Sequence, residues 1–237
     1  MNLEFQPNQI LQVKNKRIKV NKFLAAGGFS TVYLCTLDSG QNVVVKNIKT
    51  TNEDVKTATL NEIEILSRFD HPNIVSFIDS FISNHQVLII MEYCDKNLVD
   101  YMNEHYLTKL PEHQILFIFN QICSAVQYLH TTFPMMIHRD IKVENVLTNQ
   151  TKTIFKLCDF GSCTFLNIEP RQSLLISEFK ILNEEILKFT TKEYRPPEYC
   201  DLYLRLGISN KVDVWAMGCL LYKLCFFVFK SNQDHAF

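Results

Sequence analysis

Hydrophobic and polar positions follow two different patterns along the chain. In residues 17–93, runs of β-branched residues such as Val43-Val44-Val45 alternate with turn residues, which favours strands. Residues 54–69 carry apolar side chains near helical spacing and predict one helix within this region. The continuous apolar run of residues 87–91 is typical of a strand covered on both faces. The first region therefore predicts a small mixed α/β lobe.

From Asp95 onward the pattern becomes mainly helical. Residues 111–130 present one apolar face at helical spacing, and Pro111 suits a first helical turn. Residues 199–206 place apolar side chains at i, i+3, i+4 and i+7 ahead of Gly207, which predicts a short amphipathic helix. Residues 214–229 are a 16-residue apolar stretch. Because a membrane-spanning helix needs roughly 20 residues, we expect no membrane span and predict a buried core helix here.

Composition and charge exclude several classes of protein. The 237 residues are 47% hydrophobic, which is enough for a sizeable core, and 24 basic residues balance 25 acidic ones. That balance argues against a nucleic-acid-binding protein, because binding to the phosphate backbone requires an excess of Lys and Arg. The eight cysteines show no zinc-ligand spacing, and the N-terminus shows no signal peptide. We therefore expect free thiols and a soluble protein in the cytoplasm.

The first chemical motif is a turn of small residues followed by a lysine. In Leu24-Ala25-Ala26-Gly27-Gly28-Phe29-Ser30-Thr31-Val32, small residues let backbone N–H groups approach phosphate oxygens, although an ordinary hairpin turn fits this segment equally well. Lys46 ends the next predicted strand, where an ammonium group suits the α- and β-phosphates of a nucleotide. Its acidic partner is predicted to be Glu62. Glu64 is the rival, two residues further around the same helix.

The second and third motifs are more specific. In His138-Arg139-Asp140-Ile141-Lys142-Val143-Glu144-Asn145, the residue types fit phosphoryl transfer from a magnesium nucleotide. Asp140 would orient the substrate hydroxyl and accept its proton, and Lys142 would neutralise charge on the phosphoryl group. Asn145 would hold a magnesium ion, as would Asp159 in Asp159-Phe160-Gly161, which begins 14 residues after Asn145.

These motifs resemble those of a eukaryotic protein kinase over about residues 23–229. Tyr194-Arg195-Pro196-Pro197-Glu198 and Asp213-Val214-Trp215-Ala216-Met217-Gly218 complete the order, and Lys142 and Thr191 look like the serine/threonine class. A narrower resemblance is to the Numb-associated kinase family. It is carried by residues 25–30, 141–147, 159–162, 190–195 and 218–227. That family has an extra helix after the segment that contains Glu198, which the periodicity of residues 199–206 also suggests.

The resemblance implies an α+β fold, the bilobal protein kinase fold. Residues 17–93 would form an antiparallel-sheet N-lobe, and residues 94–237 a mainly helical C-lobe that lacks its final helices. Residues 1–16 would be an N-terminal extension. The implied cofactors are ATP and Mg²⁺, and the implied acceptors are Ser or Thr of protein substrates. Clathrin adaptors of endocytosis or actin-patch proteins are the implied partners.

The family's motifs also imply the candidate site residues. Met91 would be the gatekeeper, Glu92 and Cys94 would offer backbone groups to adenine, and Val32 and Leu147 would sandwich the ring. The candidate catalytic residues are Lys46, Glu62, Asp140, Lys142 and Thr191, and the candidate metal ligands are Asn145 and Asp159. The candidate nucleotide-binding residues are Leu24, Ala25, Ala26, Gly27, Gly28, Phe29, Ser30, Val32, Val44, Lys46, Met91, Glu92, Cys94 and Leu147.

Two departures from the family keep a second hypothesis open. Val44 stands where alanine is usual, and overfilling a packed site costs about 1–3 kcal/mol, so weaker ATP binding is expected. The family pairs the equivalent of Glu198 with an arginine from later helices, but no arginine follows Arg205. The chain is thus expected to be either an active serine/threonine kinase or a catalytically impaired, truncated nucleotide-binding scaffold. The segment around Glu198, which shapes a peptide site, disfavours a small-molecule phosphotransferase.

Regulation depends on the 34 residues between Gly161 and Pro196. Arg139 is expected to pair with a phosphorylated residue among Ser173, Ser177, Thr190 and Thr191. The alternative is a segment that is ordered without phosphate, which the family resemblance favours.

Overall fold

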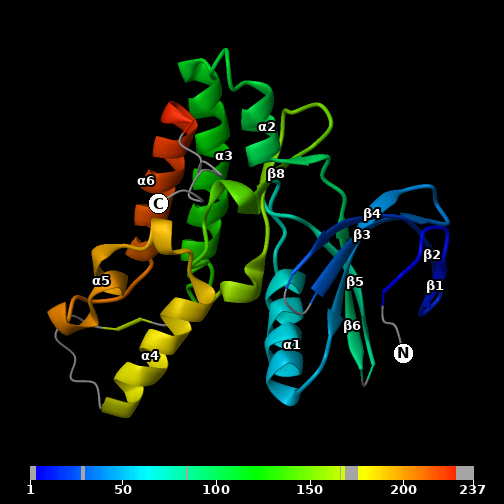
Figure 1. Cartoon of the computed structure of the whole chain (residues 1–237), viewed down its shortest axis with the longest axis horizontal. Coiled ribbons are helices and arrows are strands. Elements are labelled where there is room, and N and C mark those ends of the chain that lie inside the picture. Colours follow the sequence, from blue (N-terminus) through cyan, green and yellow to red (C-terminus); the bar gives the residue numbers. More distant parts are fainter. Residues whose placement is uncertain (1–3, 28–29, 84, 166, 169–175, 228–237) are drawn as a thin grey trace, which may run out of the picture. The chain divides into compact units, whose positions relative to one another are not determined.

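The computed structural model divides the chain into two units, Met1–Cys94 and Asp95–Phe237 (Figure 1). The structure describes residues 4–27, 30–83, 85–165, 167–168 and 176–227. Of the candidate site residues, Gly28 and Phe29 lie outside these ranges.

The first unit is built on six antiparallel strands in the order β1-β2-β3-β4-β6-β5. These strands are β1 (Ile10–Val13), β2 (Lys16–Ala26), β3 (Ser30–Leu37), β4 (Asn42–Lys49), β5 (Phe77–Ile82) and β6 (Gln86–Glu92). The antiparallel-sheet lobe expected from the resemblance is confirmed. The expectation that residues 1–16 lie outside this lobe is wrong for β1, since Leu11 and Val13 alternate into the core and β1 pairs with β2.

The two edges of this sheet approach each other because the sheet curls. β1 and β5 are at opposite ends of the strand order. Nevertheless, the Nζ atoms of Lys14 and Lys16, at the β1–β2 turn, lie 2.5 and 2.9 Å from the carboxylate oxygens of Asp79 on β5. The right-handed twist of β-strands accumulates into this kind of closure. The resulting core includes Ile18, Val20, Val43, Val45 and Ile90, all at 0% exposure.

Helix α1 (Glu53–Ser67) begins where the sequence offers an N-cap. The Asn52 side chain accepts a hydrogen bond from the Val55 amide, and Glu53 and Asp54 place negative charge at the positive end of the helix dipole. Thr59, Glu62 and Leu66 form its buried face, at the three- and four-residue spacing of one helix side. The helix contacts β5 and β6, beside which it lies in Figure 1.

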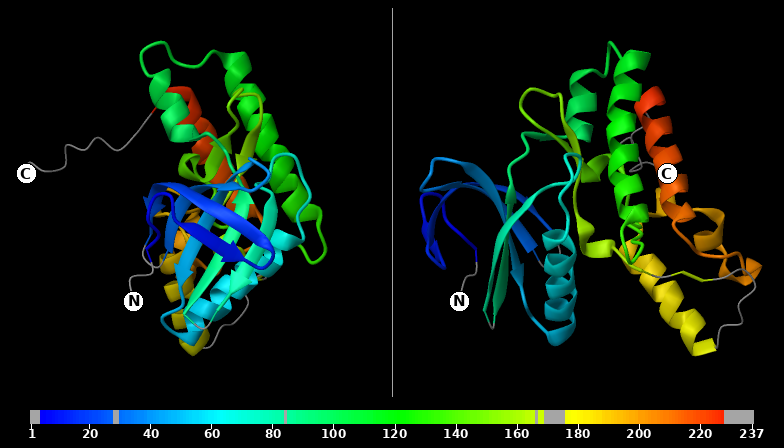
Figure 2. Two further views of the ribbon diagram at one scale, coloured as in Figure 1. Left: turned by 90° about the vertical axis from the view of Figure 1, so that its right-hand side faces the viewer. Right: turned by 180° about the vertical axis from the view of Figure 1, so that it is seen from behind.

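The second unit is mainly helical, which confirms that expectation. Helices α3 and α6 run side by side, as Figures 1 and 2 both show. The helices are α2 (Leu98–Glu104), α3 (Glu112–Thr131), α4 (Ile176–Phe189), α5 (Pro197–Cys200) and α6 (Lys211–Phe226). A small sheet in the order β7-β8-β9 comprises β7 (Lys96–Asn97), β8 (Val146–Thr148) and β9 (Phe155–Leu157). Short 3-10 turns are η1 (Val143–Asn145), η2 (Phe160–Ser162), η3 (Lys192–Tyr194) and η4 (Leu202–Leu204).

The amphipathic helix predicted over residues 199–206 is not formed. Helix α5 ends at Cys200, and Asp201 adopts an extended conformation with φ −143° and ψ 96°. Its carboxylate accepts a hydrogen bond from the Tyr203 amide at 2.9 Å and so initiates the separate turn η4. An Asp side chain that bonds to a nearby amide competes with continued helix, and here it prevails.

The prediction of a buried core helix for the apolar stretch of residues 214–229 is also wrong in part. Val212, Ala216, Leu220 and Leu224 are buried along one face of α6. Val214, Trp215, Tyr222 and Phe226 are at least 48% exposed. Because the stretch is apolar on every side, its composition does not reveal which face packs against α3.

The segment between Gly161 and Pro196, for which no helix was predicted, contains α4. Leu182 and Ile186 on this helix pack with Ile137 and Val212 in a core cluster of the second unit. The expectation of free thiols is confirmed. All eight cysteines are free thiols. None of the helices in the described ranges has the length and hydropathy that a bilayer crossing requires.

The ion pairs of Asp79 with Lys14 and Lys16 predict a pH-dependent contribution to the stability of the fold. Burial opposes ionisation of Asp79, but hydrogen bonds from Lys14 and Lys16 outweigh it and lower its pKa from 3.8 to about 2. A lowered carboxyl pKa stabilises the folded state above the unfolded pKa, and this stability is lost as pH falls through the folded pKa. Asp79→Asn should therefore cost about 1 kcal/mol at pH 7, a modest value because both lysines are exposed.

Thermal unfolding of the wild type and this variant between pH 7 and pH 3 measures the effect. The difference in Tm should stay constant down to about pH 5 and then narrow. The double variant Lys14→Met/Lys16→Met should lower Tm similarly at pH 7. A Tm difference that persists unchanged at pH 3 would contradict this assignment.

Candidate active site

In the first unit, Lys46 and Glu62 form the predicted ion pair. Lys46 lies on β4, directly opposite Val32 on β3 and Ile89 on β6. Its Nζ is 2.7 Å from Oε1 of Glu62 on α1, and the Glu62 side chain is only 8% exposed. The rival Glu64 is exposed and pairs with Arg68, the C-cap residue of the same helix. The buried face of α1 therefore selects Glu62.

Other candidate nucleotide residues share one face of the sheet with Lys46. Val32 and Val44 point to the same side as Lys46, since strand side chains alternate and directly opposed residues share a face. Met91 is opposite Val44 in the register of β4 and β6. The neighbouring Val43 and Val45 point to the other face, into the core. One face of the sheet is thus packed, and the other carries these candidates.

The small-residue turn joins the ends of β2 and β3. The Gly27 amide donates to the Ser30 carbonyl at 2.7 Å, and a Cβ at Gly27 would lie 3.2 Å from Ser30 Oγ, which is tighter than ordinary contact. Leu24, Ala25 and Ala26 are exposed at the end of β2. The exposed small side chains at the end of β2 fit close approach of a ligand to the backbone, and the phosphate-binding role of these residues stays a prediction.

The predicted adenine-binding segment follows β6. The Glu92 amide donates to the Ser76 carbonyl at 3.0 Å, and Glu92 Oε1 accepts from the Ser76 amide at 2.6 Å. Two hydrogen bonds therefore fix the end of β6, and Cys94 is the last residue of the first unit. Leu147 lies on β8 of the second unit, half-buried. Recognition of adenine by these residues stays a prediction.

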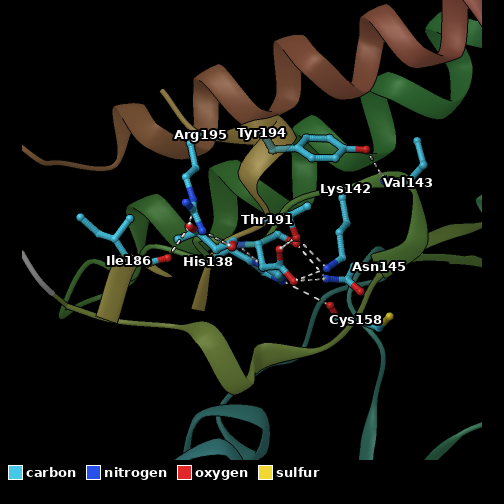
Figure 3. Close-up of polar contacts among 11 residues, drawn as sticks. His138, Lys142, Val143, Asn145, Cys158, Ile186, Thr191, Tyr194 and Arg195 are labelled. Atoms are coloured by element: carbon cyan, nitrogen blue, oxygen red, sulfur yellow. Dashed lines mark hydrogen bonds and ion pairs between the residues drawn. The ribbon is translucent and has the colours of Figure 1, made fainter. Parts of the chain in front are cut away.

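In the second unit, four predicted site residues form one hydrogen-bonded cluster, shown in Figure 3. Lys142 Nζ donates to Asp140 Oδ2 at 2.7 Å and to Thr191 Oγ1 at 2.9 Å. The Thr191 hydroxyl donates to Asp140 Oδ1 at 2.6 Å. Asn145 Nδ2 donates to Asp140 Oδ2 at 3.0 Å and to its backbone carbonyl at 2.8 Å. Three donors, two from the loop of Asp140 itself and one from Thr191, thus orient both oxygens of the Asp140 carboxylate.

The same bonds leave an oxygen of Asn145 suited to a cation. Because Nδ2 makes both bonds to Asp140, Oδ1 points the other way and accepts no hydrogen bond from the described residues. Asp159 is exposed, with its carboxylate oxygens as the other predicted ligands. No cluster of three or more His, Cys, Asp or Glu side chains in the described ranges could hold a metal on its own. This donor set fits Mg²⁺, which typically takes one or two protein oxygens and completes its shell with water and phosphates.

Backbone geometry turns Asp159 and Phe160 to different environments. Asp159 has φ 63° and ψ 79°, in the left-handed region. The side chain of the next residue, Phe160, is buried, with 1% exposure. The Phe160 ring packs edge-on against His138 with centroids 5.1 Å apart. His138 Nδ1 accepts from the Asp140 amide, so Nε2 carries the proton that it donates to the Cys158 carbonyl at 3.3 Å. His138 therefore links the motif of Asp140 to that of Asp159.

Sequence reasoning missed two residues that hold this loop. Asp213, fully buried at the start of α6, accepts hydrogen bonds from the amides of His138 (2.8 Å) and Arg139 (2.9 Å). His130, at the end of α3, contributes a third bond at 2.8 Å. In the sequence, the motif that begins at Asp213 completes the order of motifs, but it gives no role to the carboxylate. A carboxylate directly before the apolar stretch of residues 214–229 is the signal that it could be buried and bind backbone amides.

Tyr194 and Arg195 form hydrogen bonds to the segments on either side of Thr191 and Asp140. The Tyr194 hydroxyl accepts from the Val143 amide at 3.3 Å, and burial raises the pKa of this tyrosine. Arg195 donates to the Thr190 hydroxyl at 2.7 Å and to carbonyls of Leu187 and Thr190 at the C-terminal end of α4. A cation there compensates unpaired helix carbonyls. Thr191 directly follows Thr190 in the chain and is thereby positioned for its bond to Asp140.

Comparison with known proteins agrees with this geometry. The family model described as "Protein kinase domain" matches residues 18–236. A probable serine/threonine-protein kinase of Dictyostelium discoideum is 38% identical over 227 residues, which cover 92% of this chain and 20% of that protein. Serine/threonine-protein kinase ppk30 of Schizosaccharomyces pombe is 36% identical, covering 94% of this chain and 24% of the relative.

Actin-regulating kinase PRK1 of Saccharomyces cerevisiae is 33% identical over 237 residues, covering 94% of this chain and 29% of that protein. The chain thus spans less than a third of the length of each of these relatives. The family model covers nearly the whole chain, and its relatives carry serine/threonine kinase names. The chain therefore belongs to the protein kinase family, in its serine/threonine class.

Proposed function

We propose that this chain transfers the γ-phosphoryl group of ATP to serine or threonine hydroxyls of protein substrates. The observation that carries the proposal is the cluster in which Lys142, Asn145 and Thr191 all donate to Asp140. A carboxylate oriented in this way is suited to receive a proton from an attacking hydroxyl. Retention of the whole set favours an active enzyme over the catalytically impaired scaffold, because a scaffold does not need an oriented base.

Each residue of the cluster has a distinct role in the proposed reaction. Asp140 binds the acceptor hydroxyl, orients its oxygen and takes its proton as the new bond forms. Lys142 places positive charge beside Asp140, where charge develops on the transferring group. Thr191 is a positioning residue, because its hydroxyl donates to Asp140 and accepts from Lys142, and so fixes the angle between them.

Nucleotide and metal binding would draw on both units. Lys46, fixed by Glu62, would contact the α- and β-phosphates. Asn145 and Asp159 would be the magnesium ligands. When bound, Mg²⁺ neutralises charge on the phosphates as the phosphoryl group moves. An ion pair that restricts the lysine side chain reduces the entropy that this side chain loses when nucleotide binds.

The substrate class follows from likeness alone. A relative is named an actin-regulating kinase, and the motifs resemble the Numb-associated family. We infer that the substrates are threonine-containing proteins of the actin patch or clathrin adaptors, in the cytoplasm. Peptides with a single threonine, tested against matched serine and tyrosine versions, would distinguish acceptor preference.

The deciding experiment compares the purified chain with Asp140→Asn in a radiolabelled ATP assay. This isosteric change removes the proton acceptor and should lower kcat by roughly 10² to 10⁴-fold. Thermal unfolding of both proteins provides the control for folding. Equal incorporation by the two folded proteins would reject the kinase proposal and favour the scaffold.

A matched pair of glutamates tests the nucleotide-positioning lysine. Glu62→Gln removes the charge beside Lys46 and should raise the ATP KM and lower kcat/KM at least about tenfold. Glu64→Gln, two residues away on the exposed side of α1, should behave like the wild type because, within the described residues, that carboxylate pairs only with Arg68. Similar losses in both variants would show that the helix, and not the pair, is being perturbed.

Thr191 offers a test of positioning by a single hydroxyl. Thr191→Val keeps the side-chain shape but removes the bonds to Asp140 and Lys142, so kcat should fall about 10- to 100-fold. Thr191→Ser keeps the hydroxyl and should retain most of the activity. Steady-state kinetics with varied ATP separates the effects, because the ATP KM should change little. A serine variant as poor as the valine variant would contradict the hydrogen-bond role.

A further inference from the structure

The Arg139 side chain lies between three segments of the second unit. Its Nε donates to the Ser162 carbonyl at 2.5 Å, directly after the Asp159-Phe160-Gly161 motif. Its Nη1 lies 3.2 Å from Oε2 of Glu185 on α4. The guanidinium also lies over the Phe189 ring, 5.1 Å from the centroid. One cation therefore joins the loop of Asp140, the turn after Asp159, and α4.

The Arg139 guanidinium is buried, so its charge must be compensated within the protein. The Arg139 side chain is 6% exposed, whereas the Glu185 side chain is 43% exposed. A buried guanidinium is costly unless an anion and hydrogen bonds compensate it. In kinases that are switched by phosphorylation, the anion that orders the activation loop is a phosphate paired with arginine. Here a carboxylate of the chain already occupies the anion position.

Of the hydroxyls expected as phosphate acceptors, the three in the described residues do not occupy that position. Thr191 is bound to Asp140 and Lys142. Thr190 donates to the Ile186 carbonyl at 2.5 Å and accepts from Arg195. Ser177 lies eight residues before Glu185 on the same helix, about 12 Å along its axis at 1.5 Å per residue. Ser173 lies outside the described residues.

We propose that Glu185 is a positioning residue whose carboxylate supplies the anion at Arg139 and so holds Asp140 and the turn after Asp159 in place without phosphate. This inference rests on the proposed kinase function. The connection is short, because the Arg139 amide is bound to Asp213 and the next residue is Asp140. Loss of the carboxylate would leave the buried cation uncompensated and remove its link between the turn at Ser162 and α4.

Adjacent glutamates on α4 supply a matched comparison. Glu185→Gln removes the charge with little change in shape, and kcat should fall about tenfold while the ATP KM stays near the wild-type value. Glu184→Gln removes the exposed neighbouring charge, which pairs with no side chain in the described ranges, and should leave kcat unchanged. Phosphatase treatment of the wild type should leave kcat unchanged as well.

Chemical rescue distinguishes a charge role from a general loss of structure. Glu185→Ala opens space beside the guanidinium from the exposed side. Sodium acetate should then restore kcat several-fold over sodium chloride at equal ionic strength, while Glu184→Ala should show no acetate response. Absence of rescue, combined with equal kcat for Glu185→Gln and Glu184→Gln, would overturn the proposal. Loss of wild-type activity on phosphatase treatment would also overturn it.

Hydrogen exchange keeps this inference separate from the proposed function. Measured in the Asp140→Asn background, which requires no catalysis, Glu185→Gln should speed amide exchange in residues 160–165 and 176–195 but not in α3. Glu184→Gln should leave both regions unchanged. If the wild type is inactive but this local difference appears, the kinase proposal fails and the positioning contact stands. If exchange is the same in both variants, the contact does not order the segment.

Discussion

Much of the second unit depends on how one buried carboxylate is satisfied. Asp213 is 0% exposed, and within the described chain no lysine or arginine pairs with it. Its oxygens instead accept hydrogen bonds from two consecutive backbone amides, those of His138 and Arg139, and from the His130 ring. A carboxylate removed from water is stable only when such bonds replace its hydration. The Asp213 carboxylate consequently joins the start of α6, the end of α3 and the loop before Asp140.

This constraint explains an unfavourable backbone conformation at Arg139. Its φ of 69° is uncommon for a residue with a side chain. The conformation lets adjacent amides meet one carboxylate, and its cost is offset by the bonds to Asp213 and by the Ser162 and Glu185 contacts of the side chain. Asp159 shows the same feature with φ 63°, where an exposed carboxyl is followed by a buried ring. Left-handed residues thus occur on both segments that carry the predicted metal and base groups.

Local pattern allowed prediction of part of this arrangement. Glu62 could be chosen over Glu64 because helix periodicity separates their faces, and Asp140, Lys142 and Asn145 lie within six residues of one another. The helix predicted over residues 199–206 failed because periodicity does not reveal which amide an Asp side chain will capture. Helix α4 was missed although Phe179, Leu182 and Ile186 recur at three- and four-residue spacing. The Arg139–Glu185 contact joins residues 46 positions apart, and neighbouring Glu184 looks equivalent in the sequence.

The two ion pairs near the candidate site differ in a way that suits different tasks. In the Lys46–Glu62 pair both side chains are largely buried, so each charge depends on the other for compensation and their geometry is fixed. In the Arg139–Glu185 pair only the cation is buried, and its carboxylate partner remains open to water. Exchange of an exposed anion costs far less than exchange of a buried one, because the carboxylate recovers its hydration on leaving. The first pair is therefore suited to a constant structural role beside a nucleotide. The second holds the turn after Asp159 while leaving the anion replaceable.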